Sequence, residues 1–336
     1  MKAKEGHRYY SERTRLETVI PLKTPFILYV DPASVCNLKC EFCPCGGAHK
    51  DMWTEEKAAS IGIMDFSLYQ KIIDDCLEFE DNIKVLRLYK EGEPLMNRHF
   101  PDMVRYAKTT GKFNAIDTTT NGVLLNPELN RKIVEAGLDR INISVEALDE
   151  EGYKNVCGYS IDYKKYIENI RDLYEHKGNL HIFIKTVTAE QDENKYNAIR
   201  ERFYEMFGDI CDEITVEHIA PCWPGFDKEL YSKETGVYGN KIQECRVCPR
   251  LFYILTINSD GAATRCIVDW NRKMVFGDAK TESIVSLWKK MDEFRIEHLR
   301  GNRRKMIGCA DCLEIETAAL DNIDDYADEI LSKMQV

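Results

Sequence analysis

Two groups of cysteines have a spacing that suits iron-sulfur or metal chemistry, and the first is Cys36, Cys40 and Cys43 in a CxxxCxxC pattern. Three thiolates can bind three irons of a 4Fe-4S cube and leave the fourth iron without a protein ligand. A small molecule can chelate that open iron, so the pattern predicts a reactive cluster. Zinc ligands or buried thiols, with Cys45 as a fourth cysteine, are the alternative interpretation, but zinc sites normally pair two-cysteine arms.

The second group lies in the last third of the chain and contains Cys245, Cys248, Cys266, Cys309 and Cys312. Five thiols suffice for one four-iron cluster but not for two fully ligated ones. Two CxxC arms, Cys245 with Cys248 and Cys309 with Cys312, would equally make a tetrahedral zinc site. The spacing therefore predicts one metal centre and leaves iron-sulfur and zinc open.

Composition and charge limit the classes of protein that this chain can represent. It has 336 residues, 13 cysteines and a net charge of -11. The negative charge argues against nucleic-acid or anionic-membrane partners, which need a positive field. No stretch approaches the roughly 18 consecutive apolar residues of a membrane span, and residues 1–15 are charged rather than signal-like. We expect a cytoplasmic protein whose thiols are reduced and serve metal or redox chemistry.

The elements that would position the cysteines alternate between strand and helix from about residue 26. Apolar runs predict six strands, at residues 26–30, 83–89, 114–118, 140–145, 181–187 and 213–218. Apolar residues at helical spacing predict helices at residues 66–79, 98–110, 127–136, 163–176 and 194–207. The Asn126-Pro127 pair marks the start of one of these helices. Such alternation is typical of β/α units around a parallel sheet.

The character of the chain changes near residue 222. Residues 251–258 and 262–268, separated by Ser259-Asp260-Gly261, predict a β-hairpin, and residues 283–299 predict a helix that ends at Gly301. The expected organisation is an N-terminal extension at 1–23, an α/β core at 24–222, a cysteine-bearing unit at 223–320 and a helix or tail at 321–336.

The first cysteine group resembles the radical S-adenosylmethionine (SAM) superfamily. The likeness lies in the CxxxCxxC spacing, in Phe42 before the last cysteine, and in the position after the first strand. It implies a partial (β/α)6 TIM-like barrel in which SAM chelates the open iron. One electron from the cluster then cleaves SAM to a 5'-deoxyadenosyl radical, which abstracts hydrogen from a substrate.

The resemblance extends to polar residues that follow the next strands, where such sheets bind ligands. The residues that it implies for SAM binding, besides Phe42, are Gly92, Glu93, Thr120, Asn121, Ser144 and Glu146. The motif around Gly92 departs from the family pattern, because Glu91 stands where a first glycine is usual. Each residue taken alone is also explained as an ordinary polar residue of a turn or a strand end. Several of them after successive strands, in the family's order, favour a role in SAM binding.

The second cysteine group resembles the SPASM and twitch C-terminal domains of radical SAM enzymes. This likeness implies one auxiliary 4Fe-4S cluster with Cys248, Cys266, Cys309 and Cys312 as ligands. Cys245 is then a spare thiol, or an alternative ligand in place of Cys248. The zinc site described above remains the other interpretation.

Three further residues have side chains that suit catalysis. Cys222 follows the last predicted strand, where a thiol can return a hydrogen atom to a substrate radical, as in the family's epimerases; an ordinary half-buried cysteine is the alternative. Lys185 and Glu217 stand at strand positions that can face the barrel interior as acid, base or substrate anchors.

The implied function is oxidation or epimerisation of a sugar, cyclitol or similar hydroxylated small molecule, with a flavodoxin- or ferredoxin-type electron donor. Radical modification of a ribosomally made peptide is the alternative. About 25 residues precede the first strand, too few for a peptide-recognition domain, which favours the small molecule. A non-catalytic iron-sulfur electron carrier or zinc-stabilised binding module is the third hypothesis.

Overall fold

A computed structural model of the chain describes residues 2–6, 13–45, 49–220, 236–237, 241–310, 312–318 and 321–335. The strands in these segments are β1 (Lys4–Glu5), β2 (Ile27–Val30), β3 (Ile83–Arg87), β4 (Phe113–Thr120), β5 (Arg140–Ser144), β6 (His181–Thr188), β7 (Glu213–His218), β8 (Ile254–Ile257), β9 (Ala262–Thr264) and β10 (Val275–Asp278). They form one sheet in the order β1-β7-β6-β5-β4-β3-β2-β8-β9-β10. Pairing is parallel from β1 to β8 and antiparallel from β8 to β10.

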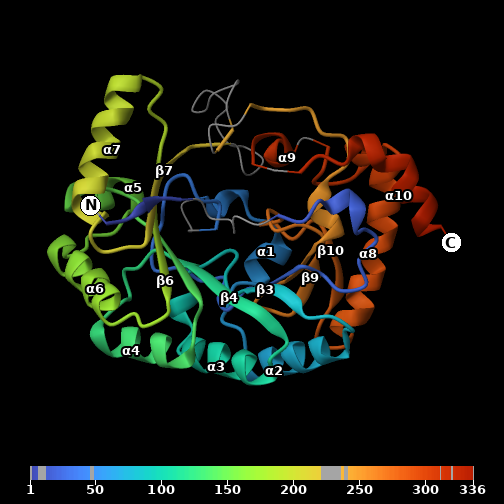
Figure 1. The fold of residues 1–336 in the computed structure, drawn as a ribbon, viewed down its shortest axis with the longest axis horizontal. Coiled ribbons are helices and arrows are strands. Elements are labelled where there is room, and N and C mark those ends of the chain that lie inside the picture. The colour runs from blue at the N-terminus through green and yellow to red at the C-terminus, as the bar shows by residue number, and fades with distance from the viewer. Residues whose placement is uncertain are drawn as a thin grey trace.

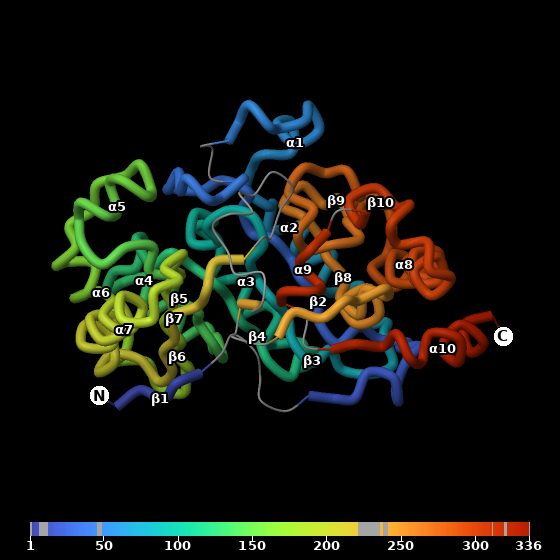
Figure 2. The backbone as a smooth tube through the Cα atoms, turned by 90° about the horizontal axis from the view of Figure 1, so that it is seen from above, coloured from blue at the N-terminus to red at the C-terminus, as the bar shows by residue number. Residues whose placement is uncertain are grey.

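The helices of the described segments are α1 (Glu55–Ala59), α2 (Phe66–Asp75), α3 (Phe100–Thr110), α4 (Pro127–Ala136), α5 (Glu150–Cys157), α6 (Tyr163–Glu175), α7 (Glu193–Phe207), α8 (Ile284–Leu299), α9 (Glu314–Thr317) and α10 (Ala327–Met334). Most of the longer helices cover the outer side of this curved sheet, whereas α1 and α9 lie inside the ring that these helices form in Figure 1. β1 and the N-terminus lie on the opposite side of the molecule from α8 and α10 (Figure 2). The first and last strands therefore do not meet, and the predicted α/β fold with a partial barrel is confirmed.

Local signals explain where the helices begin and end. The Asn126 side chain accepts hydrogen bonds from the amides of Glu128 and Leu129, and Pro127 occupies the first turn of α4. Gly137 ends this helix in the left-handed region with a φ of 86°, which a residue with a Cβ rarely adopts. Start and end both agree with the prediction.

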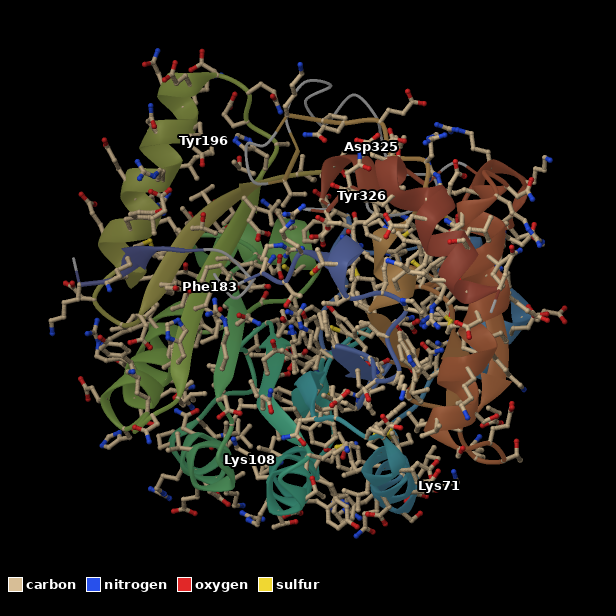
Figure 3. The ribbon with its side chains drawn as sticks, turned by 45° about the vertical axis from the view of Figure 1, so that its right-hand side comes forward. Lys71, Lys108, Phe183, Tyr196, Asp325 and Tyr326 are labelled. Carbon is tan, nitrogen blue, oxygen red and sulfur yellow. The ribbon has the colours of Figure 1, made fainter. Side chains whose placement is uncertain are left out.

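Many apolar side chains lie between the helices and the sheet, whereas the outer faces of the helices carry charged side chains. Figure 3 shows Lys71 on α2 and Lys108 on α3 at the outer surface, whereas Phe183 lies on β6. Phe183 is completely buried. A strand that is covered on both faces appears in the sequence as a nearly continuous apolar run, and such runs predicted these strands. None of the described helices is long and apolar enough to cross a membrane.

Several boundaries differ from the sequence prediction. The helix expected at residues 66–79 ends at Asp75 and continues as a 3-10 turn, Cys76–Glu78. The hairpin strand expected at 251–258 begins at Ile254, because Pro249–Phe252 form a 3-10 turn. Proline favours the first position of such a turn. β9 ends at Thr264 rather than at residue 268, and α1, α5 and β10 were not predicted.

The cysteine-bearing C-terminal unit continues the sheet of the barrel. β8 pairs in parallel with β2, in a register that places Ile27 beside Ile254 and Val30 beside Ile257. The hairpin is thus an extension of the sheet at β2, the strand that leads into Cys36. Residues 221–235, which include the expected boundary at 222 and Cys222, lie outside the described residues. α10 lies within the segment 321–336, for which helix or tail was expected.

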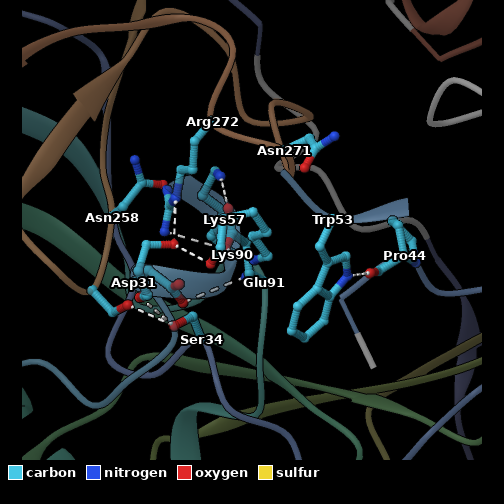
Figure 4. A network of polar contacts seen from close by, with 12 residues as sticks. Asp31, Ser34, Pro44, Trp53, Lys57, Lys90, Glu91, Asn258, Asn271 and Arg272 are labelled. Carbon is cyan, nitrogen blue, oxygen red and sulfur yellow. Dashed lines mark hydrogen bonds and ion pairs between the residues drawn. The ribbon is translucent and has the colours of Figure 1, made fainter. Parts of the chain in front are cut away.

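A buried network of charges joins the C-terminal unit to the loops at the barrel mouth, and Figure 4 shows it from close by. Glu91 forms ion pairs with Lys57 at 2.5 Å, with Arg272 at 3.3 Å, and with the adjacent Lys90. All four side chains are almost fully buried. Burial alone would raise the pKa of the Glu91 carboxyl, but the three cations lower it to about 2.

We expect Glu91→Gln to destabilise the protein by about 3–5 kcal/mol, because removing the carboxylate leaves buried cations without a partner. The measurement is the free energy of unfolding in urea. Glu80→Gln is the matched control, because Glu80 pairs with Lys23 at 3.1 Å while both side chains are at least 70% exposed. It should change stability little. Equal losses in the two variants would contradict the importance of the buried network.

Candidate functional site

The loop after β2 places the first three cysteines at the mouth of the barrel. Cys40 is buried, and Cys36 and Cys43 are half-buried. The Cys36 thiol lies 3.9 Å from the Asn121 side-chain nitrogen, and the Cys43 amide donates to the carbonyl of Cys40. Burial raises the pKa of the Cys36 thiol to about 12. Without a metal this thiol therefore stays protonated, and binding of an iron cluster must release its proton.

Helix α5, which the sequence did not indicate, supports this loop from one side. The amides of Lys39 and Glu41 donate to the carbonyls of Cys157 and Val156, each at 2.9 Å. The last carbonyls of a helix have no partner within the helix, so they are available to a neighbouring loop. The cysteine loop uses these carbonyls and is held against the end of the helix.

Gly92 supports the loop from the other side through close contact between backbones. Its amide donates to the carbonyl of Ala33 at 3.1 Å, and the amide of Glu93 donates to the carbonyl of Val35 at 2.9 Å. A Cβ on Gly92 would lie 2.2 Å from the Val35 oxygen and 2.3 Å from the Ala33 oxygen. Only glycine allows this approach, which ties the end of β3 to the residues before Cys36.

The carboxylate of Glu93 joins the loops after β3 and β4. It accepts hydrogen bonds from the Thr120 hydroxyl at 2.6 Å, the Asn121 amide at 2.8 Å and the Leu95 amide at 3.0 Å. Burial raises the pKa of Glu93 to about 7, although these hydrogen bonds act to lower it. A carboxylate has about four acceptor sites, so it retains capacity for about one further donor. Asn121 in turn donates to the Asn37 side chain at 2.8 Å.

Ser144 and Glu146 lie at the end of the next strand. Ser144 is the last residue of β5, half-buried beside Lys185 of β6. Burial raises the pKa of Glu146 to about 7, and the charge of Lys185 opposes this rise. The structure therefore brings Gly92, Glu93, Thr120, Asn121 and Glu146 to the edge of the sheet that carries the cysteine loop. For Ser144 it shows the position but no contact with that loop.

Four cysteines of the second group border one cavity: Cys248, Cys266, Cys309 and Cys312. Cys245 does not line this cavity, and its thiol donates to the carbonyl of Val247 at 3.1 Å. Arg303 positions the last pair by donating to the carbonyl of Cys312 at 3.2 Å. Within the described segments, no three His, Cys, Asp or Glu side chains converge on a point suited to a single metal ion.

His298 also lines this cavity, from the C-terminal end of α8. Its Nδ1 accepts the amide of Cys248 at 3.2 Å. Burial, with the charges of Arg303 and Arg265, lowers the pKa of His298 to about 4, so the ring is neutral at pH 7. Nothing in the sequence distinguished this histidine from the other six.

A second, larger cavity of about 520 Å³ lies between the strand ends and the C-terminal unit. Its polar walls from the barrel include Tyr29, Arg87, Tyr89, Glu146, Lys185 and Glu217. Lys185 pairs with Glu217 at 2.9 Å, and Arg87 donates to the Tyr29 hydroxyl at 2.8 Å. Phe42 of the cysteine loop reaches the same cavity. Its size lies within the range of small-molecule sites.

The two cavities share a wall. Arg250, Ile267 and Glu314 border both the larger cavity and the one lined by the four cysteines. Arg250 donates to Glu314 at 2.8 Å, and both side chains are largely buried. A molecule in the larger cavity would therefore lie between the first cysteine loop and the second cysteine group.

Comparison with protein families agrees with this geometry. A family model described as the radical SAM superfamily matches residues 30–199. The chain belongs to the radical SAM superfamily. A second model, SPASM, described as an iron-sulfur cluster-binding domain, matches residues 245–313. The radical SAM enzyme thus has a SAM-binding 4Fe-4S cluster and an auxiliary iron-sulfur cluster. The first cysteine group offers three thiols, and the second offers four around one cavity. These numbers fit a SAM-binding 4Fe-4S cluster and a fully ligated auxiliary cluster.

Two curated relatives match parts of the radical SAM chain. A tungsten-containing aldehyde ferredoxin oxidoreductase cofactor-modifying protein of Pyrococcus furiosus is 29% identical over 59% of this chain and 52% of its own length. A probable GTP 3',8-cyclase of Methanococcus maripaludis is 36% identical over 40% of this chain and 41% of its own. The chain thus spans about half or less of these relatives. The family indicates an enzyme, which removes support from the non-catalytic hypothesis.

Solved structures share the fold at low identity. BtrN in complex with AdoMet and 2-DOIA is 17% identical, with a TM-score of 0.54 over 89% of this chain and 97% of BtrN. Streptococcus suis SuiB bound to the precursor peptide SuiA is 14% identical, with a TM-score of 0.59 over 93% of this chain and 75% of SuiB. At this identity the likeness shows the fold alone.

We expect Gly92→Ala to lower SAM cleavage by about 100-fold, because misplacing a reacting group by about 1 Å has an effect of that size. The new methyl group would displace the backbone of Ala33 and Val35, and with it Cys36. The measurement is 5'-deoxyadenosine formed per intact first cluster. Gly62→Ala is the matched control, because a Cβ there would meet nothing within 4 Å. Full activity in the Gly92 variant would contradict the steric argument.

Proposed function

We propose that this radical SAM enzyme oxidises or epimerises a hydroxylated small molecule such as a sugar or cyclitol. The observation that supports this most is the cavity of about 520 Å³, lined in part by charged groups, between the SAM-site residues and the second cysteine group. Its charged groups are held in pairs, Lys185 with Glu217 and Arg250 with Glu314. Such pairs offer both donors and acceptors, which suits the several hydroxyl groups of a carbohydrate.

The ligand assignment is part of the proposal. Cys36, Cys40 and Cys43 would hold the SAM-binding cluster, with Phe42, Gly92, Glu93, Thr120, Asn121, Ser144 and Glu146 around SAM. Cys248, Cys266, Cys309 and Cys312 would hold the auxiliary cluster, and Cys245 would stay free. When bound, SAM and its cluster supply a 5'-deoxyadenosyl radical that abstracts hydrogen from the substrate.

The residues of the cavity support oxidation more than epimerisation. Oxidation of an alcohol releases a hydroxyl proton, and the Glu217 carboxylate, held by Lys185, is placed to accept it. The wall shared with the second cysteine group would bring a bound substrate close to the auxiliary cluster, which can accept the electron left on the substrate radical. Epimerisation would need a hydrogen donor in addition, for which Cys222 is the candidate from the sequence; it lies outside the described residues.

We also propose an electron-donor protein as partner and a cytoplasmic location. A flavodoxin- or ferredoxin-type protein would supply the electron for SAM cleavage. None of the 12 described cysteines is in a disulfide, which suits the reducing cytoplasm. The net charge of -11 gives no reason to add a nucleic-acid or membrane partner.

Modification of a peptide is the second candidate function. SuiB, solved with a precursor peptide, has the same fold over most of this chain. That likeness shows the fold alone, so the paired charged groups in the cavity keep the small molecule as the first choice. The two candidates differ in the substrate from which hydrogen is abstracted, which isotope transfer can identify.

The auxiliary-cluster ligands can be tested by counting iron. In a Cys36→Ala/Cys40→Ala/Cys43→Ala background, we expect about four irons per chain, all in the auxiliary cluster. Adding Cys248→Ala should remove most of this iron, whereas adding Cys245→Ala should leave it unchanged. The two cysteines are three residues apart and both buried, so the pair is well matched. The reverse pattern would make Cys245 the ligand.

The substrate class can be tested by isotope transfer. We expect deuterium from one carbon position of a perdeuterated sugar or cyclitol to appear in 5'-deoxyadenosine, with formation of a ketone. The measurement is mass spectrometry of both products over a panel of carbohydrates and peptides. Transfer from a peptide, with none from any carbohydrate, would contradict the first choice and support the second.

A further inference from the structure

His298 has a donor for which the described part of the chain offers no acceptor. The side chain is completely buried and lines the cavity of the second cysteine group. Its Nε2 atom has no hydrogen-bond partner among the described residues. Buried polar atoms without partners are rare, because each lacks the hydrogen bonds that water would otherwise provide. We therefore expect its acceptor to be a group that the cavity binds.

The hydrogen bond at the other ring nitrogen determines which nitrogen carries the proton. The Cys248 amide donates to Nδ1 at 3.2 Å, so Nδ1 must present its lone pair. A neutral imidazole has one donor and one acceptor nitrogen, which places the proton on Nε2. Nε2 is thus an N–H donor. It has no lone pair to offer a metal, so the ring is not positioned as an iron ligand.

The acceptors that fit this donor are sulfur atoms. The cavity is bordered by Cys248, Cys266, Cys309 and Cys312. A cluster held there would bring thiolate and sulfide sulfurs, which accept N–H hydrogen bonds. Such bonds are among the features that set the reduction potential of iron-sulfur clusters. They stabilise the reduced state more, because it carries more negative charge on sulfur.

We propose that the Nε2–H group of His298 donates a hydrogen bond to a sulfur of the auxiliary cluster and thereby raises its reduction potential. The proposal rests on the ligand assignment made above, but not on the identity of the substrate. His298 is a positioning and tuning residue, because it forms a hydrogen bond to the cluster and does not ligate iron. It also links the cluster to the backbone of Cys248 through its second nitrogen.

The first test is a redox titration of the auxiliary cluster alone, in the Cys36→Ala/Cys40→Ala/Cys43→Ala background. His298→Leu should lower the reduced-to-oxidised ratio at a fixed potential by about tenfold, equivalent to about 59 mV for one electron. His298→Gln should restore most of the ratio, because its amide can accept from Cys248 and also donate. An intact cluster with an unchanged potential in His298→Leu overturns the proposal.

A matched control separates the hydrogen bond from packing. Phe294 lies one turn earlier on α8 and lines the same cavity, but it carries no donor. Phe294→Leu should leave the potential unchanged, although it also replaces an aromatic ring that lines the cavity by leucine. A shift equal to that of His298→Leu would attribute the effect to packing and overturn the proposal.

The second test needs no substitution of His298, so it holds even if those variants lose the cluster. In the same background, protein labelled with 15N-histidine should show a weak 15N coupling to the reduced cluster in pulsed electron paramagnetic resonance. Absence of any coupling, or a strong coupling typical of direct ligation, overturns the proposal. A background protein without iron would refute the ligand assignment itself, and the proposal with it.

Discussion

The close contact between the end of β3 and the loop that carries Cys36 is the constraint on which the rest of the site depends. Gly92 has no side chain, so its backbone reaches the carbonyls of Ala33 and Val35. Next to it, the Glu93 carboxylate accepts three hydrogen bonds from the turns at the ends of β3 and β4. These contacts, with the α5 carbonyls on the opposite side, position three thiols at the mouth of an open barrel.

The same geometry relates the first cysteine group to the second. β8 pairs with β2 and so extends the strand pair that leads into the first group. The buried pairs around Glu91 connect Arg272 of the C-terminal unit to Lys57 of α1. With the wall formed by Arg250 and Glu314, they place a cavity that charged groups line in part between the two cysteine groups. A substrate there would have access to both redox centres of this radical SAM enzyme.

Much of this could be predicted from the sequence, because the signals are local. Strands buried on both faces read as apolar runs, and Asn126 with Gly137 marks both ends of α4. The β2–β8 pairing was not predicted, because long-range pairing has no local signature. Helix α5 was missed although Asp149 and Gly158 cap its two ends, because it is short and carries few apolar residues. The donor role of His298 depends on an amide 50 residues earlier in the chain, so only the folded structure reveals it.

The most direct test of the central claim is a SAM-cleavage assay of reduced, iron-reconstituted protein. Cys36→Ala should abolish formation of 5'-deoxyadenosine. Cys45→Ala should retain it, because Cys45 is a buried neighbour of Cys43 to which we assign no cluster iron. Cleavage that persists without Cys36, or zinc in place of iron at this loop, would contradict the claim.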